Sequence, residues 1–284
     1  MTGASETRTV PAPTERGPNN LMVRIAVALV LAPAAIAIAY IGGWPWVALA
    51  TLAAIGMFVE WLMIVVTSRD RRVVAGGVMA LAVAGISLAL GRVDAAAIVG
   101  VLGALGLAIP AAGSRGWNML GFCYAFAALF ASALVRADQL WGFTALLLIL
   151  LVVWVTDIGG YFAGRGIGGP KLWPRVSPKK TWAGAVGGFI ASLLIGAGFG
   201  AMSLGKFGPL LVLAASLSVA SQLGDLFESA VKRRFGVKDS SQIIPGHGGL
   251  LDRLDGFVAA VVLAAAIGIL RGGADGVGRG LMVW

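Results

Sequence analysis

Charged residues are scarce in this sequence. Of its 284 residues, 12% are charged and 58% are hydrophobic, whereas a soluble domain carries about a quarter charged residues. This shortage argues against a soluble globular protein. A single cysteine, Cys123, excludes an intramolecular disulfide and a cysteine metal cluster. A single histidine, His247, excludes a zinc site built from two or three histidines.

Long apolar runs dominate the chain instead. A run of about 18 or more residues can cross the hydrocarbon core of a bilayer as a helix. We therefore predict an all-α, polytopic integral membrane protein with about nine transmembrane helices. Residues 1–20 contain three prolines among polar residues and are expected to form a disordered cytoplasmic tail. The predicted spans centre on 22–41, 46–66, 73–90, 95–112, 117–135, 139–162, 182–203, 208–230 and 253–270.

The distribution of basic residues predicts how the chain crosses the membrane. With the N-terminus in the cytoplasm, 17 of the 22 basic residues fall in cytoplasmic segments. Cytoplasmic loops are enriched in Lys and Arg, so this bias supports an N-in/C-out arrangement. Loss of one span between Arg72 and Arg115 would turn both polar loops, 163–181 and 231–251, outward. We expect a multi-pass protein of the inner (plasma) membrane whose active site faces the cytoplasm, with no nucleic-acid partner despite the net charge of +9.

Polar residues divide the chain into two parts. Residues 21–135 are expected to form an N-terminal transmembrane bundle, and residues 136–284 a catalytic transmembrane region that holds both polar loops. The 42 glycines predict close helix packing in lipid, for example at 184–188, and the same packing would allow a homodimer. Glu60 is an isolated acid within the second span. It either makes a hydrogen bond between helices or contacts a substrate.

The loop after the sixth span suits phosphate groups. Asp157 lies near the end of a strongly apolar helix, where topology requires no acid. Glycines then expose backbone N–H groups, and Arg165, Lys179 and Lys180 supply positive charge. The spacing of Gly and Lys differs from a Walker A motif. The alternative is a flexible cytoplasmic loop whose charge only sets topology.

A second block carries acids on two neighbouring helices. Asp225, Glu228 and Ser229 have helical spacing that predicts one common face, and Lys232 follows one turn later. Asp252 and Asp255 are one turn apart at the start of the last span. Carboxylates on two converging helices suit Mg²⁺, which usually binds one or two carboxylates together with substrate phosphates. Two such ions would clamp a phosphoryl or nucleotidyl displacement.

Structural ion pairs are the alternative for these acids. In that interpretation Asp225, Asp252, Asp239 and Asp255 pair with Lys232, Arg233 and Arg253 and have no chemical role. His247 lies between glycines, where it either contacts phosphate or caps a turn.

The stretch from Ser229 to Asp255 resembles the signature of the phosphatidate cytidylyltransferase (CDP-diacylglycerol synthase) family nearly position for position. It reads SAVKRRFGVKDSSQIIPGHGGLLDRLD. Residues 177–182 (SPKKTW), and Asp157 with Tyr161, Gly164 and Arg165, also resemble family blocks. The close resemblance covers residues 154–257. Ala183 and Gly256 stand where family members often have an acid and a hydroxyl residue.

The resemblance implies the reaction of CTP with phosphatidate to give CDP-diacylglycerol and pyrophosphate. It also implies Mg²⁺, as one ion, two ions or together with a monovalent cation. Asp225 and Asp252 would bind the metal, and with Lys232 and Asp255 they would form the catalytic set. The substrates would contact Asp157, Arg165, Ser177, Lys179, Lys180, Glu228, Ser229, Arg233, Lys238, Asp239, His247 and Arg253.

Two other functions compete with this interpretation. An enzyme that uses CTP on another lipid, such as a polyprenol kinase, would share the spans and the metal-binding acids. It should lack the complete His-Gly-Gly-x-x-Asp-Arg-x-Asp block, which is present at residues 247–255. An ion-coupled transporter should show repeat symmetry and acids scattered near the middle of the bilayer. Here the acids gather beside basic loops.

Overall fold

The computed structural model describes residues 19–65, 70–108, 115–241 and 249–284. Long helices account for most of these residues, joined by one short hairpin and a small C-terminal cap. In chain order the elements are α1 Asn19–Ile41, α2 Gly43–Ile64, α3 Arg71–Ala89, α4 Val93–Ala108, α5 Arg115–Ala137, α6 Gly142–Gly166, β1 Lys171–Trp173, β2 Ser177–Thr181, α7 Trp182–Ala201, α8 Phe207–Arg234, α9 Leu251–Gly272, η1 Ala274–Gly276 and α10 Val277–Met282.

Most of the helices are long enough to cross a bilayer. Seven of them, α2, α3 and α5 to α9, combine sufficient length with high hydropathy. Two apolar stretches are shorter, namely the 16 residues of α4 and the part of α1 from Leu29 to Ile41. The prediction of an all-α, polytopic membrane protein is therefore confirmed. The hairpin was not predicted, since residues 163–181 were expected to form a loop.

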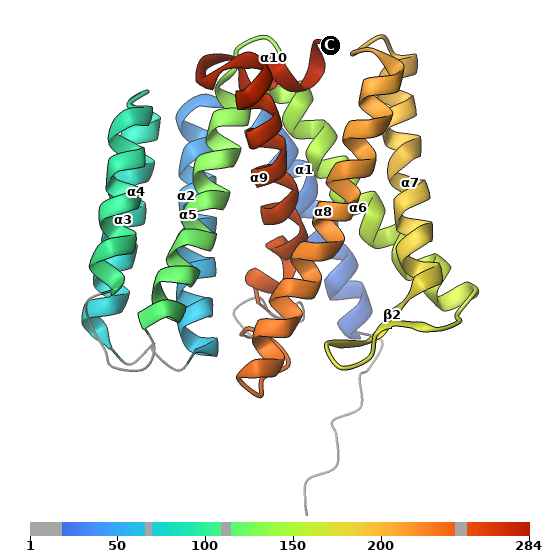
Figure 1. Ribbon diagram of the computed structural model, residues 1–284, viewed down its shortest axis with the longest axis horizontal. Helices are drawn as coiled ribbons and strands as arrows, with labels where there is room; N and C mark the ends of the chain where they lie inside the picture. The colour runs from blue at the N-terminus through green and yellow to red at the C-terminus, as the bar shows by residue number, and fades with distance from the viewer. Residues whose placement is uncertain (1–18, 66–69, 109–114, 242–248) are drawn as a thin grey trace, which may run out of the picture.

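The region between Arg72 and Arg115, on which the predicted topology depends, does contain two helices. Asp70 caps α3, because its carboxylate accepts a hydrogen bond from the backbone N–H of Arg72 at 3.0 Å. Gly91, with a φ of 73°, makes the turn into α4. As a result, α1 begins at the end of the bundle that carries the hairpin, whereas the chain ends beside α10 at the opposite end (Figure 1). Which end faces the cytoplasm stays a prediction.

Two hydrophobic clusters form the core. One gathers side chains of α6, α8, α9 and α10, and the other gathers side chains of α2, α3 and α4. Helices α5 and α9 contribute to both clusters, for example through Leu134 and Val261 in the first and Leu129 and Val258 in the second. The predicted N-terminal bundle and catalytic region therefore share packed helices.

Glycines bring α6 and α7 into close contact, as the sequence predicted. A Cβ atom added at Gly184 would lie 2.8 Å from the carbonyl oxygen of Gly160, and one added at Gly188 would overlap the carbonyl oxygen of Thr156. Small residues allow helix backbones to approach in lipid. This contact fixes the position of the hairpin, which connects the two helices at one end of the bundle (Figure 1).

We predict that Gly188→Ala destabilises the protein although Ala is the better helix former. The added methyl group would push α7 away from Thr156, and overpacking of this kind costs about 1–3 kcal/mol. Gly198→Ala is the matched control, because Gly198 lies in the same helix with no atom within 4 Å of the added Cβ. Thermal unfolding in detergent should show a lower midpoint for Gly188→Ala alone. Equal midpoints would contradict the packing described here.

Candidate active site

A cavity of about 500 Å³ opens between α6, α7, α8, α9 and the hairpin. Its lining combines acidic and basic side chains in equal number, which is unusual between apolar helices. The charged lining residues are Asp157, Arg165, Lys179, Lys180, Asp225, Asp252, Arg253 and Asp255. The other lining residues are Thr156, Gly160, Tyr161, Gly164, Leu172, Thr181, Gly184, Ala185 and Gln222.

The hairpin carries two lysines to the edge of this cavity. Strands β1 and β2 pair antiparallel, and Thr181 at the end of β2 caps α7 by accepting a hydrogen bond from the N–H of Gly184 at 3.1 Å. The guanidinium of Arg233 donates to the carbonyl oxygen of Val176 at 3.3 Å, which fastens the hairpin to the end of α8. Lys179 and Lys180 therefore extend over the helices from a fixed strand.

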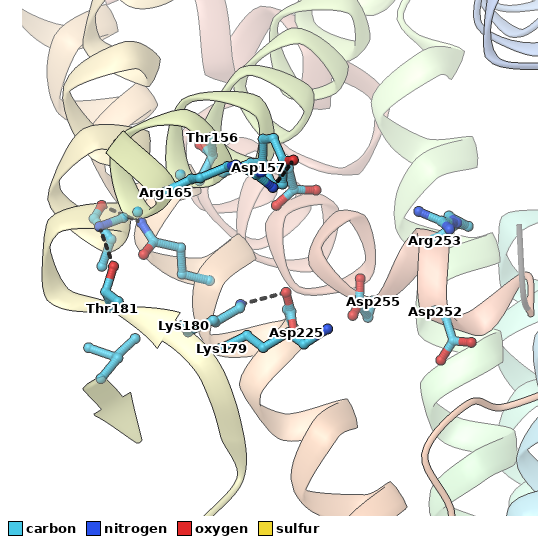
Figure 2. Close-up of a pocket in the computed structure, with 17 residues that line it drawn as sticks. Thr156, Asp157, Arg165, Lys179, Lys180, Thr181, Asp225, Asp252, Arg253 and Asp255 are labelled. Atoms are coloured by element: carbon cyan, nitrogen blue, oxygen red, sulfur yellow. Dashed lines mark hydrogen bonds and ion pairs between the residues drawn. The ribbon is translucent and has the colours of Figure 1, made fainter. Parts of the chain in front are cut away.

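Lys180 forms an ion pair with Asp225. Its Nζ lies 2.5 Å from Oδ2 of Asp225, and both side chains are partly exposed to the cavity. Figure 2 shows this contact between the strand and α8. The hydroxyl of Ser229 lies 3.4 Å from the other carboxylate oxygen, Oδ1. Asp225 thus pairs with a lysine of the hairpin, which the structural alternative had not named.

Asp255 reaches the same cavity because α8 and α9 approach closely. A Cβ atom added at Gly224 would lie 2.6 Å from the carbonyl oxygen of Asp255, so only glycine fits this crossing. The hydroxyl of Tyr124, on α5, donates to that same carbonyl oxygen at 3.2 Å. Figure 2 shows Asp157, Asp225 and Asp255 around the centre of the cavity, whereas Asp252 and Arg253, nearer the start of α9, lie to one side.

Asp225 and Glu228, predicted on a common face of α8, have different surroundings. Asp225 lines the cavity, whereas Glu228 is 1% exposed and lies outside the lining. Positions three residues apart on a helix differ by about 60° in direction, because each residue turns the chain by about 100°. Within this range of directions, Asp225 pairs with Lys180 of the hairpin, and Glu228 pairs with Lys232 of the same helix. The helix therefore presents two separate polar pairs.

Lys232 joins Glu228 to Asp252. Its Nζ lies 2.6 Å from Oε2 of Glu228 and 2.6 Å from Oδ1 of Asp252, and the residue is 8% exposed. Asp252 also accepts hydrogen bonds from the backbone N–H groups of Ser240 and Gly249, each 3.1 Å from Oδ2. The ion pair between Asp252 and Lys232 is the one that the structural alternative anticipated. Asp252 nevertheless lines the cavity.

The described structure brings together about half of the predicted site residues. All eight charged lining residues were predicted from the sequence. Ser177, Glu228, Ser229, Lys232, Arg233, Lys238 and Asp239 lie outside the lining. Of these, Lys238 and Asp239 are exposed beyond the end of α8. His247 belongs to the residues that the structure does not describe.

Several lining residues were not predicted as site residues. Gln222 is three residues before Asp225, and its amide donates to the carbonyl oxygen of Ala185 at 3.3 Å, which links α8 to α7. Helical spacing from Asp225 would have indicated it. Thr156 precedes Asp157, and its hydroxyl donates to the hydroxyl of Ser218 at 2.9 Å. Leu172 gives no signal in the sequence.

Within the described ranges, no three acidic, histidine or cysteine side chains are grouped closely enough to hold a metal ion unaided. Mg²⁺ rarely requires such a cage, since it usually binds one or two carboxylates, waters and substrate phosphates. The cavity offers carboxylate oxygens of Asp225, Asp252 and Asp255 beside basic side chains. This donor set is hard oxygen throughout, which is the chemistry that Mg²⁺ prefers.

We predict that two paired lysines respond differently to truncation. Lys232→Ala should lower the free energy of unfolding by about 3 kcal/mol, because it leaves the buried Glu228 and the partly buried Asp252 without their cation. Lys180→Ala should cost below about 1 kcal/mol, since the Lys180 side chain is 29% exposed. Thermal unfolding in detergent measures both, with the exposed Lys238→Ala as control. A smaller loss for Lys232→Ala than for Lys180→Ala would contradict the structural role of Lys232.

Comparison with known proteins indicates the same family as the sequence resemblance. Residues 22–270 match the cytidylyltransferase family. A phosphatidate cytidylyltransferase of Brucella suis is 42% identical over 259 residues, which cover 89% of this chain and 94% of that protein. Those of Bacillus subtilis and Haemophilus influenzae are 45% identical over 126 residues and 44% identical over 133 residues, covering 44% of this chain each and 47% and 45% of those proteins. The resemblance drawn from the sequence is confirmed, and the chain belongs to the cytidylyltransferase family.

Proposed function

We propose that this protein transfers the cytidylyl group of CTP to phosphatidate within the membrane. The products are CDP-diacylglycerol, a precursor in phospholipid biosynthesis, and pyrophosphate. The observation that carries the proposal is the cavity of balanced charge at the hairpin end of an apolar helix bundle. The name that the Brucella, Bacillus and Haemophilus relatives share supports the choice of both substrates.

The charges of the cavity suit two phosphate-bearing substrates and a divalent cation. Four basic side chains line the cavity from three elements, namely Arg165 on α6, Lys179 and Lys180 on β2, and Arg253 on α9. Four acids oppose them, so the basic groups alone leave the charge of a triphosphate uncompensated. A divalent cation held by the acids would supply the missing positive charge.

Asp225 and Asp252 would hold Mg²⁺, and Asp255 contributes a further carboxylate to the same lining. These residues fit the ion because they present oxygen donors on two helices that meet at the Gly224 crossing. When bound, Mg²⁺ offsets the negative charge that develops on phosphate oxygens in the transition state. A second Mg²⁺ or a monovalent cation would find its ligands among the same acids.

The reaction needs no protein nucleophile. A phosphate oxygen of phosphatidate attacks the α-phosphorus of CTP and forms the new P–O bond. The bond between the α-phosphorus and the bridging oxygen breaks, and that oxygen leaves with pyrophosphate. Lys179, Lys180 and Arg165 hold the phosphate groups in line, and positioning of this kind supplies much of the rate enhancement in phosphoryl transfer. A substrate phosphate would replace the Asp225 carboxylate as the partner of Lys180, which leaves that carboxylate available to the metal ion.

The position of the cavity suits one substrate from the cytoplasm and one from the bilayer. The hairpin end carries the basic loops, which by the positive-inside bias face the cytoplasm of an inner membrane, where CTP is available. The lining helices α6, α7, α8 and α9 are long and apolar enough to cross a bilayer, in which phosphatidate would stay during the reaction. Association of two copies stays a prediction from the glycine content.

The position of the label in CTP distinguishes the proposed reaction from the kinase alternative. Purified protein is incubated with phosphatidate, Mg²⁺ and CTP labelled at either the α- or the γ-phosphate. Cytidylyl transfer should label the lipid from α-labelled CTP only. A lipid kinase, tested in parallel on polyprenol, would label its lipid from the γ-phosphate only. Failure to form a labelled liponucleotide would reject the proposed function.

Asp225→Asn should reduce this activity by about a thousandfold or more, because it removes a charge on which both the metal and Lys180 depend. The variant should stay folded, since Asp225 is partly exposed to the cavity. Asp94→Asn is the matched control, because Asp94 is exposed on α4, outside the cavity lining, and forms an exposed ion pair with Arg92. Wild-type turnover by Asp225→Asn would refute the assignment.

Removal of divalent metal should abolish the activity without unfolding the protein. With EDTA in excess, we expect loss of liponucleotide formation and full recovery on addition of Mg²⁺. The midpoint of thermal unfolding should change little, because the acids have Lys180 and Lys232 as partners when no metal is bound. Full activity in EDTA would contradict the metal role of Asp225 and Asp252.

A further inference from the structure

Glu60 lies in α2, away from the lining of the cavity, and is 0% exposed. Each carboxylate oxygen accepts two hydrogen bonds. Oε1 accepts from the hydroxyl of Ser241 at 2.7 Å and from the N–H of Leu250 at 2.8 Å. Oε2 accepts from the hydroxyl of Ser240 and from the N–H of Leu251, both at 2.8 Å. Of its two predicted roles, the structure therefore shows a hydrogen bond between helices.

These contacts replace the local cap that α9 lacks. The first N–H groups of a helix have no partner within the helix and are usually satisfied by a side chain just before it. Leu250, at that position, offers no such side chain. A carboxylate from another helix, 190 residues earlier in the chain, accepts from two of the N–H groups instead. The start of α9 is thereby fixed to α2.

The two segments that donate hydrogen bonds to Glu60 also donate to Asp252. Ser240 donates its hydroxyl to Glu60 and its backbone N–H to Asp252. Gly249 donates its N–H to Asp252, and the next N–H, that of Leu250, goes to Glu60. The two acids are thus held by alternating donors of residues 240–241 and 249–251. Loss of the contacts to one acid would displace the donors to the other.

The surrounding residues leave room for this arrangement. A Cβ atom added at Gly249 would overlap the hydroxyl oxygen of Ser240 and lie 2.6 Å from Oε2 of Glu60. On α2, one turn before Glu60, a Cβ added at Gly56 would lie 2.8 Å from Cδ2 of Leu250. Glycine at these two positions allows the carboxylate and Leu250 to reach each other.

We propose that Glu60 is a positioning residue for the reaction, acting through Asp252. Glu60 holds two N–H groups at the start of α9, so it fixes how the first turn of that helix is rotated against α2. Because successive residues of a helix differ by about 100° in direction, this rotation decides where the acids of that turn point. Glu60 thereby keeps Asp252 and Asp255 directed into the cavity. The inference rests on the proposed function, because it assigns Glu60 to the same site.

Glu60→Gln tests this role with little change of shape. Glutamine places an NH₂ group where one carboxylate oxygen accepted a backbone N–H, so at least one N–H at the start of α9 loses its acceptor. We expect kcat to fall by about 10–100-fold, as for other residues that orient the ligands of a site. The KM for CTP should change by less than about 3-fold, because the basic side chains that hold the triphosphate stay in place. Amide hydrogen exchange of residues 249–252 should accelerate, while exchange in α2 stays unchanged.

Trp46→Phe is the matched control in the same helix. It removes one buried hydrogen bond, from Nε1 of Trp46 to the carbonyl oxygen of Ser132 at 3.2 Å. Trp46 is about 21 Å from Glu60 along the helix, so a loss of stability without displacement of α9 should leave kcat within about 2-fold of the wild type. Ser240→Ala adds a second test. Combined with Glu60→Gln it should cost little more than Glu60→Gln alone, because the hydroxyl acts through Glu60.

Wild-type kcat and unchanged exchange in Glu60→Gln would overturn the proposal, and so would equal losses of kcat in Glu60→Gln and Trp46→Phe. Should Glu60→Gln fail to fold, Ser240→Ala removes a single donor and is measured in the same way. A wild-type protein without cytidylyl transfer would instead reject the proposed function. The exchange of residues 249–252 would then still decide whether Glu60 holds the start of α9.

Discussion

Carboxylates inside an apolar helix bundle need partners, and this requirement determines the contacts around the cavity. Asp225 is paired with Lys180 of the hairpin, and Asp252 with Lys232 of α8. Glu60 has four hydrogen-bond donors from the start of α9 and the segment before it. Because each partner comes from a different element than the acid, satisfying the acids fastens the hairpin to α8, α8 to α9, and α9 to α2.

The helices themselves could be predicted closely from the sequence. An apolar run and its length are local properties, so hydropathy located all nine long helices of the described chain. The differences lie at polar ends. Helix α6 continues to Gly166 where residue 162 was expected, and α8 continues to Arg234 where residue 230 was expected. A helix can extend beyond the apolar region whenever its backbone hydrogen bonds continue, and hydropathy does not report this.

The partners of the acids could not be predicted in the same way. The charged residues of the lining were found because an acid or base in an apolar region stands out. Which base pairs with which acid depends on how elements that are distant in the sequence pack against one another. Lys180 and Asp225 are brought together by a hairpin whose strands have three and five residues, too few for a recognisable alternation. The different partners of Asp225 and Glu228 likewise depend on which side chains surround α8.

The described residues of the N-terminal helices do not line the cavity, but Glu60 of α2 contacts the start of α9, which carries two of the lining acids. The sequence resemblance stood out only over residues 154–257, which suggested that the first half of the chain is generic membrane scaffold. The match to the family covers residues 22–270, and 89% of the chain aligns with the Brucella relative. Glu60 offers a physical reason why the family match extends into the N-terminal helices, because it supplies the hydrogen-bond acceptors that the start of α9 lacks. Side chains of α5 and α9 belong to both hydrophobic clusters. The packing of the N-terminal helices therefore affects where α9 and its acids lie. A site assembled in this way depends on the packing of both halves, so its geometry is a property of the whole helix bundle.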